Sequence, residues 1–145
     1  MSTELEQFLA DILAKQRAAE QALHDGDAEP RLALWSRADP VTLFGAKLTG
    51  IGWAAIEPMF REVASWFGGS TEFEFEVIAA GVSGTLAYTV GYEKNRVLIN
   101  DEERVYTLRV THVYRREAGQ WRIVHRHGDV PPGDAPFVVE RRPER

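Results

Sequence analysis

The feature that most constrains the fold is a change in the spacing of apolar residues near residue 70. Before it, apolar residues recur at intervals of three and four, the spacing of one face of an α-helix. From residue 71 they alternate with polar residues, as in TEFEFEV, which is the spacing of a β-strand. Helices followed by a succession of long strands predict an α+β fold.

The boundaries of these elements follow from local signals. Thr3 and Glu6 form a capping box at the start of the first helix, and Gly26 marks its end. Pro58 lies inside the third helical pattern and predicts a late start or a kink. We expect helices at 3–24, 29–40 and 53–67, and strands at 41–44, 71–82, 85–94, 104–116 and 120–127.

Composition narrows the class of protein. The chain has 145 residues, enough for one domain with a core, and we expect a single domain with a core over about 1–132 and a tail over 133–145. It contains no cysteine and no run of 18 apolar residues, and its net charge is −5. These features predict a cytoplasmic protein that has no cofactor. They also predict that the protein binds neither membranes nor nucleic acid.

The last two strands define two faces. If EAG forms a three-residue hairpin loop, Arg109 lies opposite His127 and Thr111 opposite His125. One face then has the pattern of a ligand cavity, with apolar walls and a few polar groups: Arg109, Thr111, Val113, Trp121, Ile123, His125 and His127. The other has the pattern of a homodimer patch with a charged margin: Tyr106, Leu108, Val110, His112 and Tyr114.

The histidines allow several chemical roles. His125 and His127 could hold a metal, but only Asp129 or Asp39 could complete the site, so we expect no metal. His127 titrates near neutral pH and is the candidate catalytic acid or base, although a structural role stays open. Arg109 either anchors an anionic ligand or forms a salt bridge with Asp129 or Asp39.

The segment RVTHVYRREAGQWRIVHRHGD resembles the C-terminal hairpin of the nuclear transport factor 2-like superfamily. The resemblance is to its SnoaL-like and ketosteroid isomerase-like branch, which includes the calcium/calmodulin-dependent kinase association domain. It implies a cone-shaped, curved antiparallel sheet packed against three N-terminal helices, the nuclear transport factor 2-like or cystatin-like fold. It also implies a pocket inside the cone and dimers through the outer face of the sheet.

The resemblance also assigns individual positions. Phe44, in VTLFG, stands where ketosteroid isomerases carry a catalytic Asp, which implies that the usual isomerase mechanism is absent. Val90 and Thr111 stand where the association domain carries arginines. Because the family's helices flank the pocket, Trp35 and Trp53 are expected at its mouth. The full expected ligand site is Trp35, Trp53, Tyr88, Tyr92, Arg109, His125 and His127.

Three functions remain open at this stage. The first is a pocket protein that binds a small, anionic organic ligand. The second is an isomerase, cyclase or dehydratase that uses His127 as acid or base. The third is a noncatalytic dimerisation module.

Overall fold

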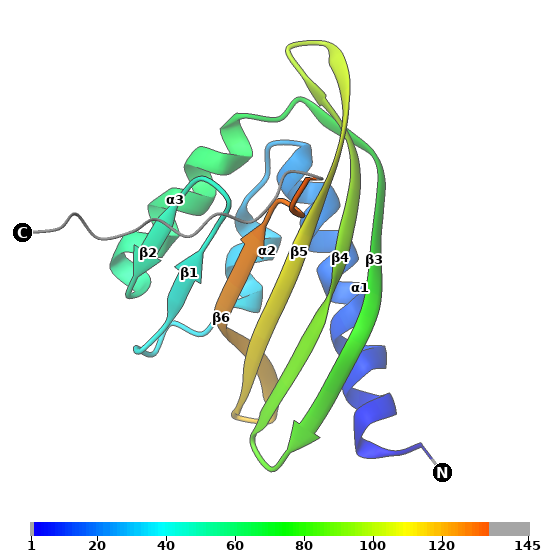
Figure 1. The fold of residues 1–145 in the computed structure, drawn as a ribbon. Coiled ribbons are helices and arrows are strands. Elements are labelled where there is room, and N and C mark those ends of the chain that lie inside the picture. The colour runs from blue at the N-terminus through cyan, green and yellow to red at the C-terminus, as the bar shows by residue number, and fades with distance from the viewer. Residues whose placement is uncertain (1, 134–145) are drawn as a thin grey trace, which may run out of the picture.

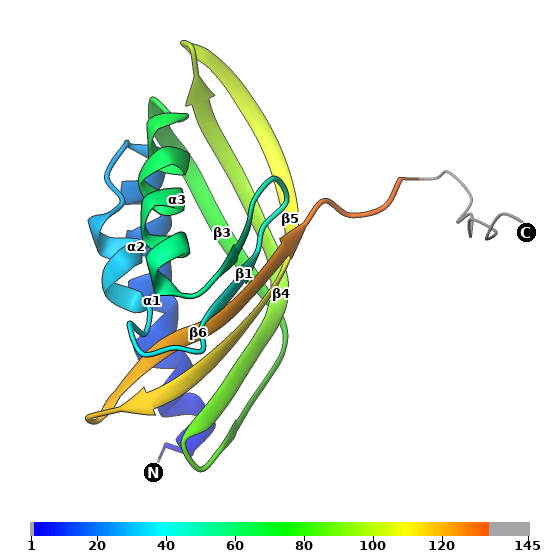
Figure 2. The same ribbon diagram turned by 90° about the vertical axis from the view of Figure 1, so that its left-hand side faces the viewer.

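The computed structural model describes residues 2–133 and has a six-stranded sheet that curves around three helices (Figures 1 and 2). The α+β fold is therefore confirmed, whereas the expected tail lies almost entirely outside the described residues. None of the described helices is long and apolar enough to cross a membrane. In chain order the elements are α1 (Glu4–His24), α2 (Glu29–Leu34), β1 (Thr42–Phe44), β2 (Thr49–Ile51), α3 (Trp53–Ser65), β3 (Gly69–Ser83), β4 (Leu86–Ile99), β5 (Glu102–Glu117) and β6 (Gln120–Asp129).

The sheet is mixed rather than purely antiparallel. The strands lie in the order β2-β1-β6-β5-β4-β3. Strand β1 pairs in parallel with β6, so the expectation of an antiparallel sheet is wrong at this one pairing. The parallel pairing places the loop between β1 and β2 beside the end of β6, where it contributes to the site described below (Figure 1).

The helices form where the sequence predicts them, with two differences. The capping residue Thr3 accepts a hydrogen bond from the Glu6 backbone N–H at 3.1 Å, as expected. Helix α2 ends at Leu34 because Trp35 is extended and bridges to Ile123 on β6. Helix α3 runs unbroken through Pro58, whose missing N–H is offset by burial of the helix's inner face.

The β5–β6 hairpin has a different register from the one expected. Its turn has two residues, Ala118 and Gly119, both with positive φ. A bulge at Val124 of β6, opposite Val113 and Tyr114, then shifts the pairing again, so that Arg109 faces Asp129 and Thr111 faces His127. The expected pairs of Arg109 with His127 and Thr111 with His125 are therefore wrong.

The bulge also changes which residues share a face. Trp121 and Ile123, on the turn side of the bulge, point into the core and are 8% and 3% exposed. His125 and His127, beyond it, point away from the helices. A single extra residue in a strand reverses the alternation for everything that follows. The expectation that Trp121 and Ile123 share a face with the two histidines is wrong for this reason.

The two faces are exchanged relative to the prediction. Val110, His112 and Tyr114 are each 2% exposed, because they lie on the inner face of the sheet beneath the helices. Tyr106 and Leu108 line a cavity on the same side. These five residues therefore cannot form a homodimer patch on the outside of the sheet, and the predicted patch is corrected.

Candidate functional site

A cavity of about 580 Å³ lies between the three helices and the inner face of the sheet. This volume is in the range of small-molecule sites in proteins. Residues from all three helices, from β1 and its following loop, and from β4, β5 and β6 line it. The walls are mostly apolar and include Leu23, Leu43, Leu48, Phe60, Val63, Phe67, Ile99 and Leu108.

A buried ion pair between β4 and β6 forms one polar part of the lining. Arg126 donates from Nη1 and Nη2 to the two oxygens of Glu93, each at 2.8 Å. Gln16 on α1 donates to the same carboxylate at 3.2 Å, and Arg126 Nη1 lies 3.0 Å from His112 Nε2. Burial opposes ionisation of Glu93, but the charge and hydrogen bonds of Arg126 outweigh it and hold the pKa of this carboxyl below its usual range.

A glycine lies beside this ion pair. An added Cβ at Gly128 would lie 3.4 Å from Nη2 of Arg126, at the near limit of an ordinary contact. Both residues belong to the inner face of β6, and the guanidinium passes close to Gly128 on its way to Glu93.

A second ion pair joins the two first helices. Arg31 on α2 binds Glu20 on α1, and its guanidinium carbon lies 5.2 Å from the centre of the Phe60 ring. Both side chains are buried and both line the cavity. Burial lowers the pKa of Arg31 to about 9, so it remains charged at neutral pH.

A tyrosine and a histidine form the third polar element. The Tyr106 hydroxyl and His24 Nε2 share a hydrogen bond at 2.7 Å, and Tyr106 faces the cavity. Burial raises the pKa of Tyr106 to about 12 and lowers the pKa of His24 to about 4. At neutral pH the pair is therefore an uncharged hydroxyl beside an uncharged imidazole.

The buried charges of the cavity are balanced. Its carboxylates, Glu20 and Glu93, each face a guanidinium, and the Tyr106–His24 pair adds no charge. Two exposed cations, Lys47 and Arg104, also belong to the lining. A carboxylate held in an ion pair with a lowered pKa is a weak base, so Glu93 is poorly suited to abstract a proton. Within the described residues no group of three or more histidines and carboxylates could hold a metal ion.

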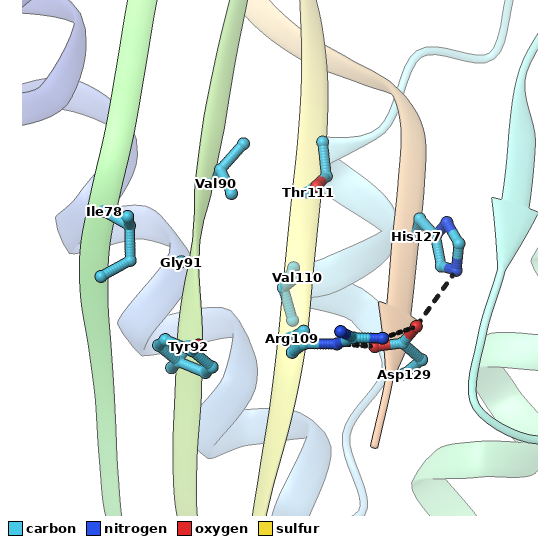
Figure 3. Close-up of a pocket in the computed structure, with 9 residues that line it drawn as sticks. All are labelled: Ile78, Val90, Gly91, Tyr92, Arg109, Val110, Thr111, His127 and Asp129. Carbon is cyan, nitrogen blue, oxygen red and sulfur yellow. Dashed lines mark hydrogen bonds and ion pairs between the residues drawn. The ribbon is translucent and has the colours of Figure 1, made fainter. Parts of the chain in front are cut away.

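The residues expected to bind a ligand lie largely on the outer face. Tyr92, Arg109 and His127 line a shallow hollow of about 330 Å³ there (Figure 3). The strand pairing places Tyr88 and His125 on this face as well. These five side chains therefore share one face of the sheet, the one that points away from the helices.

Arg109 forms the salt bridge that was one of its two expected roles. It donates from Nε and Nη2 to the two oxygens of Asp129 at 2.6 and 2.8 Å (Figure 3). His127 Nε2 lies 3.7 Å from the same carboxylate, and its side chain is 51% exposed. His125 Nδ1 is 2.7 Å from the Thr42 hydroxyl, a contact that fixes its ring.

The remaining expected positions lie outside both hollows. Trp35 is 2% exposed and packs in the core against Phe60, while Trp53 lies under the guanidinium of Arg37 at 5.6 Å. Phe44 is 43% exposed and its ring packs edge-on against His125 and His127 on the outer face. The β1 residue that faces the cavity is its neighbour Leu43, which also has no carboxylate.

Sequence reasoning missed the polar residues of the cavity: Glu20, Arg31, Glu93, Tyr106 as a lining residue, and Arg126. A usable signal was present. Glu93 and Arg126 have opposite charges and lie on strand faces that also carry Thr89, His112 and Tyr114. Opposite charges on one strand face are compatible with a buried ion pair. Sequence reasoning excluded this possibility because it placed the charged residues of that face at the exposed margin of a dimer patch.

Comparison with known proteins agrees with the architecture. Residues 12–132 match the family model described as the SnoaL-like domain. No curated protein matches the chain. A nuclear transport factor 2-like protein of unknown function from Pseudomonas putida KT2440 is 25% identical over 93% of this chain and 97% of its own, with a TM-score of 0.66.

Two further solved structures share the fold at lower identity. A protein of Parabacteroides distasonis, provisionally named a ketosteroid isomerase, is 17% identical over 90% of this chain and 93% of its own, with a TM-score of 0.67. The association domain of C. elegans CaMKII is 15% identical over 89% of this chain and 100% of its own, with a TM-score of 0.65. At these identities the likeness concerns the fold alone.

Proposed function

This chain belongs to the SnoaL-like domain family, and from that premise we propose that it binds a small, uncharged and mostly apolar organic molecule in its inner cavity. The observation that carries the proposal is the composition of the cavity. Its apolar walls enclose about 580 Å³, and its few polar groups converge from α1, α2, β4, β5 and β6. This combination is typical of sites in which apolar contact supplies affinity and polar contacts fix orientation.

Binding of an anionic ligand at Arg109 is less well supported than binding of an uncharged ligand in the inner cavity. Asp129 already occupies the guanidinium with two hydrogen bonds, so a ligand carboxylate would have to displace it. The hollow is shallow, and both partners of the salt bridge are substantially exposed. An anion bound there would compete with water as well as with Asp129.

An enzyme that uses His127 as acid or base is also less well supported. His127 lies on the outer face, away from the cavity, and its side chain is half exposed. Neither Phe44 nor Leu43 supplies the carboxylate of an isomerase. We therefore propose binding, rather than proton transfer, as the activity of the cavity.

The proposal is tested by filling the cavity. Leu108→Trp adds a large side chain to the inner face of β5, whereas Thr107→Trp adds the same side chain to the adjacent position on the opposite face. The probe is prodan, an uncharged naphthyl ketone whose emission wavelength depends on the polarity of its surroundings. We expect wild type and Thr107→Trp to bind it and Leu108→Trp to lose at least about tenfold in affinity.

Two results would count against the proposal. One is the absence of saturable prodan binding to wild type at concentrations up to its solubility limit. The other is equal binding by the two tryptophan variants, which would place the probe outside the cavity. Circular dichroism of each variant verifies that the fold is retained.

A second candidate function is self-association through the outer face of the sheet. Within the described residues, the large apolar side chains that remain exposed there include Phe44 at 43%, Ile51 at 75%, Ile78 at 57%, Leu86 at 52%, Tyr88 at 43% and Val105 at 67%. Exposed apolar groups on one face are typical of a protein interface. We propose a homodimer through this face, in place of the inner-face residues expected from the sequence.

The dimer is tested by sedimentation equilibrium of Ile78→Glu against Val130→Glu. Val130 is 66% exposed and lines the inner cavity beyond the end of β6, so it is the matched control. We expect wild type and Val130→Glu to be dimers and Ile78→Glu to be a monomer. A monomeric wild type at 100 µM, on the order of the affinity of a weak interface, would refute the dimer.

A further inference from the structure

Arg31 has fewer hydrogen bonds than a buried arginine requires. A guanidinium has five N–H donors, yet within the described part of the chain its one hydrogen-bonding partner is Glu20. The residue is only 7% exposed, so bulk water reaches it poorly. The other buried arginine of the cavity, Arg126, is by contrast bound to both oxygens of Glu93 and lies beside His112.

The ion pair with Glu20 uses only the Nη2 atom of Arg31, and Arg31 is part of the cavity lining. Its Nε and Nη1 atoms are not among the polar atoms that packing seals off without a partner. We infer that a molecule in the cavity can reach them. A buried cation with unsatisfied donors is costly unless an acceptor completes its shell.

We propose that Arg31 orients the bound molecule by donating hydrogen bonds to an uncharged carbonyl oxygen, so that the cavity selects ketones, esters or amides over carboxylic acids. The proposal rests on the proposed function, because it assigns a ligand class to the same cavity. Arg31 lies where such an oxygen could be reached from the apolar space, beside Phe60 and opposite the sheet.

The charge balance of the cavity explains the preference for an uncharged acceptor. Arg31 lies within electrostatic reach of both Arg126 and Glu93. The buried part of the lining holds two carboxylates and two guanidiniums, all of them in ion pairs, whereas the other two cations of the lining, Lys47 and Arg104, are exposed to solvent. A carboxylate bound at Arg31 would place a third negative charge beside two positive ones in the buried part of the cavity, which is unfavourable. A carbonyl oxygen satisfies the N–H groups without adding charge.

The experiment compares two probes that share a ring system. Prodan carries a ketone, and 6-(dimethylamino)-2-naphthoic acid carries a carboxylate in its place. At pH 7.5 we expect wild type to bind the ketone at least about tenfold more tightly than the acid. Equal or tighter binding of the acid would overturn the proposal.

The role of Arg31 is tested with Arg31→Lys, which keeps the charge beside Glu20 but removes the planar set of N–H donors. We expect about a tenfold loss of prodan affinity, the scale of one charge-assisted hydrogen bond. We also expect a blue shift of the bound probe's emission because its carbonyl loses a donor. Arg61→Lys is the matched control, since Arg61 is exposed on α3 and pairs with Glu29 outside the cavity.

The outcomes separate this proposal from the one on which it rests. Loss of prodan binding in Leu108→Trp, together with unchanged affinity and emission in Arg31→Lys, would leave the cavity as the site and refute the role of Arg31. Prodan binding that survives Leu108→Trp would instead refute the proposed function. If Arg31→Lys does not fold, the comparison of ketone and acid in wild type still decides the ligand class.

Discussion

At the scale of single residues, the inner face of the sheet is defined by a buried ion pair rather than by apolar side chains alone. Glu93 and Arg126 have side chains 1% and 6% exposed, and they connect β4 to β6 across β5. Two charges removed from water are tolerable only because each compensates the other and neighbouring groups complete the hydrogen bonding. Replacing one partner of the ion pair should therefore lower the stability of the fold more than replacing both.

Arg126→Met should lower the free energy of unfolding by about 3–5 kcal/mol, because it leaves Glu93 buried without its partner. The double variant Glu93→Leu/Arg126→Met should recover most of that loss. The control Arg109→Met breaks the exposed pair with Asp129 and should cause no measurable change. Urea unfolding of the four proteins is the measurement, and a single variant as stable as the double one would contradict the account.

His24 predicts how stability depends on pH. Burial lowers its folded-state pKa from 6.5 to about 4, so between these values the unfolded chain binds a proton that the folded chain does not. Stability is therefore fully present above pH 6.5 and is lost as the pH falls toward 4. A shift of this size corresponds to on the order of 3 kcal/mol.

Chemical denaturation at pH 7, 5.5 and 4.5 measures this effect in wild type and in His24→Gln. The variant should show a shallower pH dependence, since it has no imidazole to protonate. Some dependence should remain, because burial also lowers the pKa of His112 well below its usual value. Identical slopes for the two proteins would remove His24 from the explanation.

At the scale of elements, the turn between β5 and β6 sets the register of the strand that carries Arg126. Ala118 and Gly119 have φ values of 50° and 80°, the left-handed region in which a non-glycine residue is strained. Asparagine tolerates this conformation better than alanine, and a β-branched residue tolerates it worse.

Ala118→Asn should therefore raise the free energy of unfolding by about 0.5–1 kcal/mol. Ala118→Val, at the same position, should lower it by about 1 kcal/mol. Thermal unfolding of both variants beside wild type is the measurement. A stabilising valine would mean that the turn does not hold the left-handed conformation.

The same hairpin shows how far the sequence could predict the structure. The change of apolar spacing identified the helices and strands, and alternation placed Arg109, His125 and His127 on one face. It could not reveal the bulge at Val124, because a bulge is one unpaired residue with no composition of its own. Nor could it distinguish a two-residue turn from a three-residue loop in EAG.

Alternation also could not decide which face of the sheet meets the helices. The inner face carries Glu93, His112 and Arg126, residue types that are usually exposed. The outer face carries Phe44, Ile78 and Tyr88, residue types that are usually buried. Ion pairs and hydrogen bonds formed between distant strands invert the usual preference, and they become apparent only once the strands are paired.

At the scale of the whole molecule, the sheet curves around the helices, which cover one of its faces and leave the other open (Figure 2). The cavity lies on the side of the helices. The helices are too few to cover both sides of the sheet. Apolar space with a balanced set of charges therefore lies within one chain, and exposed apolar groups lie on the opposite side. We therefore propose ligand binding inside the curve of the sheet and self-association on its outside.

The most direct measurement is a methyl nuclear magnetic resonance titration of the protein with prodan. Methyl groups of Leu23, Val63 and Leu108 line the inner cavity, whereas Val90 lies in the outer hollow. The account predicts saturable shifts of the three cavity residues and none at Val90. Shifts confined to Val90 and its surroundings, or no saturable shift of any methyl group, would contradict it.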